Sequence, residues 1–236
     1  MRSVRMETEA VCTNGDRGGL INKKKMKKKV DYKPLFVPNT YYHCYNHAVG
    51  DEQLFREKEN YSYFLDLYKK YVAPISMTYA YCLMPNHYHF LIRIASVEQL
   101  KSRYLELKPE AVIDWETMDW HRFITRQLGN FFNAYAKAIN KRFSRRGALF
   151  EDDVKRPRID TEAYFLTTLR YIHQNPIHHG FVDGLEDWDF TSYPAYLSTL
   201  KTGWYKTEVL NRFGSLQAFC EFHQDFRILP EFDEMY

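Results

Sequence analysis

The chain has 236 residues, 45% hydrophobic content and a formal net charge of +3, enough to bury one good core and a small appendage. It contains neither a signal peptide nor a run approaching the roughly 18 apolar residues of a membrane span, so we expect a cytoplasmic protein without a membrane partner. The four cysteines lack any C-x-x-C spacing, which argues against a disulfide framework and against a thiolate zinc site.

The excess positive charge lies in the first 30 residues, which carry nine Lys or Arg against three acids. This stretch has no apolar periodicity, so residues 1–31 are expected to form a disordered arm that holds phosphates by counterion release. The candidate phosphate-binding lysines are Lys23, Lys24, Lys25, Lys27, Lys28 and Lys29. Two other interpretations stay open, namely a solubilising terminus and an extension from an upstream start codon.

Alternating and helical spacings predict four strands and two helices in the next part of the chain. The expected strands are 40–49, 75–83, 87–94 and 148–158, and the expected helices are 57–72 and 121–143. Residues 95–120 are expected to be irregular. The β-α-β-β-α-β order indicates an α+β fold of the ferredoxin-like, split β-α-β kind, with an antiparallel sheet covered by helices.

Apolar residues at helical spacing return near the C-terminus, between residues 205 and 229. They predict a helical appendage or extension over 201–236. The chain is therefore expected to consist of the basic arm 1–31, a main domain 32–200 and this appendage.

The strand at 87–94 carries two histidines, His87 and His89, two positions apart. Strand side chains alternate between faces, so both imidazoles point the same way. Two neutral histidines on one face make half of a divalent-metal site, although the same spacing also occurs on ordinary polar strand faces.

A second informative segment is the predicted helix 161–175, which is expected to end near Pro176 because the residue before a proline disfavours the α region. Tyr171 and Asn175 are four residues apart and share a face of this helix. If that face meets the two histidines, two nitrogens and one oxygen are available to Mg²⁺ or Mn²⁺, and a phenol lies beside them as a nucleophile.

The other histidines need separate weighing. His43 and His47 lie on one face of the first strand, and we favour ordinary polar strand positions over an extra ligand or a phosphate contact. His173, His178 and His179 flank the end of the second segment, where a cation complements the helix dipole or touches a nucleic acid.

Four motifs, LMPNHYHFLI, RRGALFEDDVK, YIHQNPIHHGFV and WDFTSYPAY, resemble in order and spacing the single-tyrosine HUH transposases of the insertion-sequence two-hundred class. The likeness is greatest to their REP-associated tyrosine transposase branch and covers about residues 34 to 200. It implies that His87 and His89 bind the metal, that Tyr171 is the nucleophile and that Asn175 is the third ligand. Tyr88 stands where smaller apolar residues are more usual, a departure that should alter packing on the opposite strand face.

The resemblance implies metal-dependent cleavage of hairpin-bearing single-stranded DNA through a 5′-phosphotyrosine intermediate, by a monomer or a homodimer. We expect Tyr171 to act in the same chain as the histidines. Arginines that are candidates for phosphate contacts are Arg145, Arg146, Arg156 and Arg158. Two other classes remain open: a metal-dependent hydrolase using His43, His47, His87 and His89, and a catalytically silent, domesticated nucleic-acid-binding protein.

Overall fold

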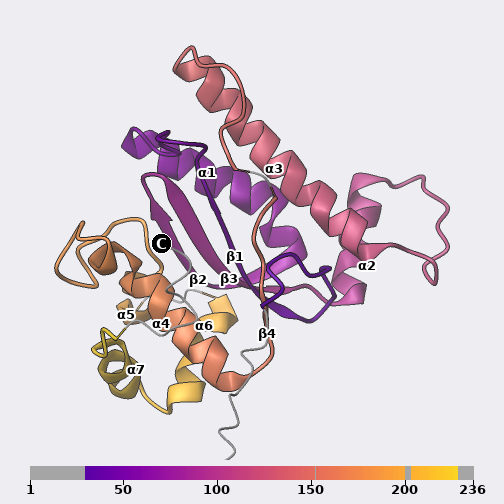
Figure 1. The fold of residues 1–236 in the computed structure, drawn as a ribbon. Helices are drawn as coiled ribbons and strands as arrows, with labels where there is room; N and C mark the ends of the chain where they lie inside the picture. Colours follow the sequence, from indigo (N-terminus) through magenta and orange to yellow (C-terminus); the bar gives the residue numbers. More distant parts are fainter. Residues whose placement is uncertain (1–29, 152, 200–202, 228–236) are drawn as a thin grey trace, which may run out of the picture. The chain divides into compact units, whose positions relative to one another are not determined.

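The structure, a computed structural model, describes residues 30–151, 153–199 and 203–227, so the predicted lysine-rich arm lies outside the described residues. At its centre is a four-stranded antiparallel sheet in the order β2-β3-β1-β4 (Figure 1). The strands are β1 (Tyr41–His47), β2 (Ser76–Met84), β3 (His87–Ile94) and β4 (Arg158–Ile159). Because β1 lies between β3 and β4, the sheet has the split β-α-β order, and the predicted α+β class is confirmed.

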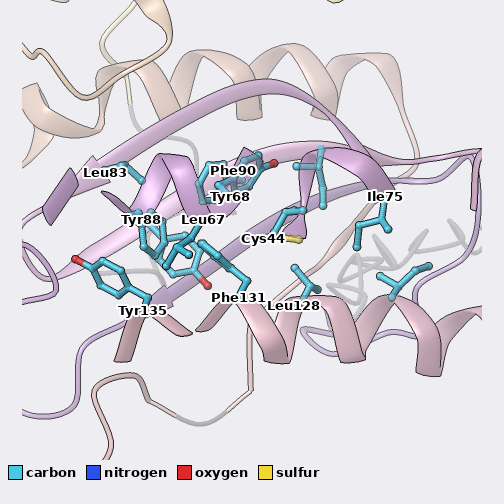
Figure 2. Packing of buried hydrophobic residues seen from close by; sticks show 14 of the residues in the cluster. Cys44, Leu67, Tyr68, Ile75, Leu83, Tyr88, Phe90, Leu128, Phe131 and Tyr135 are labelled. Atoms are coloured by element: carbon cyan, nitrogen blue, oxygen red, sulfur yellow. The ribbon is translucent and has the colours of Figure 1, made fainter. Parts of the chain in front are cut away.

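One face of the sheet packs against α1 (Lys58–Tyr71) and α3 (Trp120–Arg142), which contribute to one buried apolar cluster. Tyr88 belongs to this cluster, 1% exposed and with its ring centroid 5.6 Å from that of Phe64 in α1. Figure 2 shows Tyr88 among the buried side chains of the two helices and the sheet. Tyr88 therefore lies on the sheet face opposite the histidines, as the alternation of strand side chains predicts.

The other face of the sheet packs against α4 and the C-terminal helices. These helices are α4 (Glu162–His178), α5 (Tyr193–Leu197), α6 (Gly203–Phe213) and α7 (Leu216–His223). Val209 of α6 and Phe219 of α7 are fully buried in a second apolar cluster with Leu91 of β3. The residues predicted as a C-terminal appendage thus pack directly on β2 and on α4.

Two helices are absent from the expectations: the short α5, and α2 (Val97–Leu107), which lies within the segment predicted to be irregular. Helix α2 is the longer of the two. Its start has a capping box, in which the Ser96 side chain accepts from the Gln99 backbone and the Gln99 side chain accepts from the Ser96 N–H. The S-x-x-Q pattern is a sequence signature of a helix start. A short 3-10 turn, η1 (Ala73–Ile75), leads into β2.

The last strand is much shorter than the predicted 148–158. Beyond the two residues of β4, isolated bridges join Lys155 to Tyr45 and Phe150 to Ala48. Between these bridges the β1 side advances three residues and the other side advances five, so two extra residues interrupt the ladder. The segment follows β1 without forming one continuous strand.

Helix α4 extends beyond its predicted end and includes Pro176. A proline in the last turn removes one backbone N–H but does not stop the helix from completing that turn at His178. Its start agrees with the sequence, because the Thr161 side chain accepts from the backbone N–H of Tyr164.

Two smaller features concern the cysteines and the membrane. Cys44 of β1 and Cys82 of β2 are buried and free. Within the described ranges, no helix combines the length and the apolar character needed to span a membrane.

Candidate active site

Strand β3 presents His87 and His89 on the sheet face that α4 covers. The two imidazoles are 2% and 1% exposed, and their ring centroids are 5.1 Å apart. The alternation of side chains along the strand, readable in the sequence, sets this arrangement. Because both rings are buried, their chemistry depends on the few groups that surround them.

Helix α4 brings Tyr171 and Asn175 of the same chain to these histidines. The Asn175 Oδ1 lies 2.9 Å from the Nε2 of His87. The Tyr171 ring meets the His89 ring edge to face, with centroids 5.4 Å apart and planes at 84°. Tyr171 is 4% exposed and Asn175 fully buried, so the four residues form one interior cluster.

Both ring nitrogens of His87 meet an amide oxygen. Its Nδ1 lies 2.8 Å from the Oδ1 of Asn86, and its Nε2 lies 2.9 Å from the Oδ1 of Asn175. A neutral imidazole has one N–H, so it donates to only one of these oxygens, and a lone pair on Nε2 requires the proton on Nδ1, facing Asn86. The Nδ2 of Asn175 is buried without a hydrogen-bond partner among the described residues.

This donor set fits a divalent cation. Neighbouring ligands on an octahedral ion, each about 2.1 Å from it, lie about 3 Å apart, and the separation of His87 Nε2 from Asn175 Oδ1 matches that spacing. With the proton of His87 on Nδ1, its Nε2 and the Asn175 Oδ1 would both turn a lone pair towards such an ion. In the described residues no group of three or more His, Cys, Asp or Glu side chains is placed to hold a metal, so Asn175 is needed to complete the set with His87 and His89.

Burial sets the charge state of both histidines. Desolvation lowers the pKa of His87 to about 3, and it lowers the pKa of His89 well below its ordinary value. Nearby imidazoles act in the same direction. Both rings are therefore neutral at neutral pH, as metal ligation requires.

The histidines of β1 lie closer to the site than the sequence interpretation assumed. The Nε2 of His43 is 3.0 Å from the Nδ1 of His89, and His43 is fully buried. The ring of His47 stacks on that of His87, with centroids 4.9 Å apart. The preference for ordinary polar strand positions is therefore wrong for His43, which belongs to the buried cluster.

The histidines after Tyr171 divide between two environments. His173 is 1% exposed and bonds to His223 and Ser192, with a pKa far below its ordinary value because of burial, so it is not the helix-end cation that was expected. The ring of His179 lies 4.8 Å from that of His87, and the ring of His178 lies 6.3 Å from that of Tyr171.

The four candidate arginines also divide into two groups. Arg145 forms a 3.1 Å ion pair with Glu52 and also donates to a backbone carbonyl. Arg156 donates to three backbone carbonyls. These two guanidinium groups brace the fold, whereas Arg146 and Arg158 are exposed, and phosphate binding by them stays a prediction.

Comparison with known proteins gives one structural likeness. No protein-family model matches the chain, and no curated protein matches it significantly. The chain is similar to a solved REP-associated tyrosine transposase bound to a REP hairpin, with a TM-score of 0.48 and 14% sequence identity. The likeness covers 72% of this chain and 87% of that one. That protein is of the class that the sequence motifs resemble. The chemistry available to this chain follows from its own side chains.

Proposed function

We propose that this chain is a metal-dependent tyrosine transposase that nicks hairpin-bearing single-stranded DNA and transfers the cut strand. The supporting observation is that Tyr171 and Asn175 contact His87 and His89 in the interior of one chain. A hydrolase would need only the ligands and a water. A nucleophilic side chain at that place favours a covalent mechanism.

In this mechanism the Tyr171 oxygen attacks a backbone phosphorus in line with the bond to the 3′ oxygen. A bond forms between the tyrosine oxygen and the phosphorus, and the bond to the 3′ oxygen breaks. The phenol loses its proton, the leaving 3′ oxygen gains one, and the 5′ phosphate stays on Tyr171. Because the phosphoester is kept, a 3′-hydroxyl can later attack it and rejoin a strand without ATP.

The side chains of His87, His89 and Asn175 would hold Mg²⁺ or Mn²⁺, with Asn86 placed to accept the proton of His87 on Nδ1 when Nε2 binds the ion. When bound, such an ion withdraws charge from non-bridging phosphate oxygens and orients the scissile group. The packing of α4 against β2 and β3 holds Tyr171 at a set position beside the ligands.

DNA binding is proposed to use groups outside this cluster. Arg146 and Arg158 are exposed cations of the described residues, and the lysine run of the first 30 residues adds further charge. Such contacts hold the backbone and contribute little to sequence choice.

The test is covalent trapping on a denaturing gel. The full-length protein is mixed with Mn²⁺ and a labelled library of single-stranded hairpins with randomised stems and flanks. We expect a protein-DNA adduct for the wild type and none for Tyr171→Phe, which keeps the ring but removes the nucleophilic oxygen. Tyr164→Phe, the other tyrosine of α4, is the matched control and should still form the adduct.

Two outcomes would contradict the proposal and indicate a different class of protein. Cleavage without an adduct, retained in Tyr171→Phe, would indicate a hydrolase in which water attacks. Hairpin binding with neither cleavage nor an adduct would indicate a catalytically silent binding protein.

A further inference from the structure

The ring of His43 is in hydrogen-bond contact with the Nδ1 of His89, one of the proposed metal ligands. In the β1–β3 ladder His43 lies opposite Leu91, so it reaches His89 diagonally, two residue pairs along the ladder and on the same face of the sheet. The contact joins His43 Nε2 to His89 Nδ1 at 3.0 Å, and the two rings are nearly parallel, at 29°. Both side chains are at most 1% exposed, so no bulk water competes for this bond.

The direction of this bond decides whether His89 can bind a cation. A neutral imidazole has one N–H and one lone pair. If His43 donates, His89 carries its proton on Nε2, and that nitrogen has no lone pair to offer. If His89 donates from Nδ1, the lone pair of His89 is on Nε2, the only ring nitrogen not already bonded to His43.

We propose that His43 is a positioning residue that accepts a hydrogen bond from His89 and thereby fixes His89 in its metal-binding tautomer. The inference rests on the proposed function only in taking His89 as a ligand. His43 itself touches neither DNA nor the ion. Groups that orient ligating histidines in this way typically contribute about 10–100-fold in metal affinity.

The same cluster offers a parallel on the other histidine. The Nδ1 of His87 lies 2.8 Å from the Asn86 Oδ1, an acceptor supplied by its neighbour in sequence, so His87 can adopt the tautomer with its proton on Nδ1. His89 has no such neighbour, because Tyr88 and Phe90 point to the opposite face. Its acceptor comes from another strand, and His43 occupies that place.

His47 provides a matched control. It is also a histidine of β1 and stacks on the other candidate ligand, His87, at 4.9 Å. No hydrogen bond joins the ring of His47 to His87 in the described part of the chain, so replacing it with phenylalanine keeps an aromatic stack and leaves the ligand tautomers alone.

The direct test is ¹⁵N NMR of the histidine side chains in the full-length, metal-free protein at neutral pH. We expect the His89 signals of a neutral ring protonated on Nδ1. A ring protonated on Nε2 in the wild type would overturn the proposal without any variant being made.

Variants then test the consequence for binding. In His43→Leu the acceptor is absent, so His89 should populate both tautomers and the Mn²⁺ affinity, measured by calorimetry, should fall about 10–100-fold. His43→Gln offers an amide oxygen for the same bond and should restore the tautomer and most of the affinity. His47→Phe should change neither measurement.

The outcomes separate this inference from the proposed function. Unchanged affinity and tautomer in His43→Leu, or a loss that His43→Gln fails to restore although it folds, would overturn the positioning role. Absence of a covalent DNA adduct with the wild-type protein, together with Mn²⁺ binding that depends on His43, would instead overturn the transposase assignment and leave the positioning role standing.

Discussion

The Nε2 of His87 and the Oδ1 of Asn175 lie 2.9 Å apart in the protein interior, while the Nδ1 of His87 lies 2.8 Å from the Oδ1 of Asn86. A neutral imidazole has one N–H, so it can donate to only one of these two oxygens. Binding of an ion at Nε2 requires the proton on Nδ1, where Asn86 accepts it, and His87 and Asn175 then both turn lone pairs towards the ion.

Replacing Asn175 with leucine should therefore separate stability from binding. Asn175→Leu removes one hydrogen-bond partner of His87 together with a buried Nδ2 group that has no partner among the described residues, and His87 can still donate from Nδ1 to Asn86, so the free energy of unfolding of the metal-free protein should change little. Its Mn²⁺ affinity should fall at least ~10-fold. Urea unfolding and calorimetry measure the two effects, and a parallel loss of both would mean that Asn175 serves only the fold.

The buried histidines should make the protein sensitive to acid. Burial lowers the pKa of His43 and His87 to about 3 and that of His223 to about 4. Below the pKa of about 6.5 that a histidine has in the unfolded chain, the unfolded state binds protons that the folded state does not bind. The free energy of unfolding therefore falls as the pH falls. Within this window, each such group lowers the free energy of unfolding by about 1.4 kcal/mol for every unit by which the pH falls.

Urea unfolding of the metal-free protein across a pH series tests this expectation. The midpoint should change little between pH 8 and 7 and fall steeply from about 6 towards 4. A midpoint that stays flat down to pH 5 would show that these rings are hydrated or charged in the folded protein.

The link between α4 and α7 yields a prediction on stability. His173 Nδ1 bonds to His223 Nε2 at 2.9 Å, and His223 Nδ1 donates to the Phe219 carbonyl. His223→Leu leaves the His173 N–H buried and unpaired, which should cost about 1–3 kcal/mol of the free energy of unfolding. In the double variant with His173→Leu both partners are apolar, so part of that loss should return, and an additive loss would contradict the pairing.

The lysine-rich arm stays a prediction because it lies outside the described residues. Deleting residues 1–30 removes nine basic and three acidic side chains, a formal charge of +6. Hairpin affinity should fall and its dependence on salt should flatten, while the cleavage site stays the same. Filter binding across a salt series, with cleavage mapping beside it, measures both. An unchanged salt slope would identify the arm as a solubilising segment.

Much of the fold follows from local patterns in the sequence. β3 begins at His87 and ends at Ile94 as predicted, because a tight turn and alternating side chains mark both the start and the faces of a strand. α2 was missed although Ser96 and Gln99 carry its capping box, because charged residues are frequent around it and only Leu100 of the helix is buried. The end of the sheet near β4 depends on two extra residues opposite β1, which no periodicity records.

Part of the candidate site also follows from the sequence, and part of it depends on the fold. The pairings of Tyr171 with Asn175 and of His87 with His89 follow from helix and strand periods. The hydrogen bond between His43 and His89 depends on the β1–β3 register, which cannot be read from the sequence. His173 was readable as a different case, because residues two apart on a helix face different directions.

The depth of Tyr171 has a consequence for the kind of DNA that the proposed enzyme would accept. Its side chain is 4% exposed, beneath the surface formed by α4 and the sheet. The phosphates of a duplex are carried on a wide, stiff rod that cannot bend sharply within a few nucleotides. A flexible, unpaired stretch can thread one phosphate inward, as enzymes that act on extruded nucleotides require. Selectivity for unpaired strands would then come from how far the nucleophile is recessed, with no contact needed to read a base.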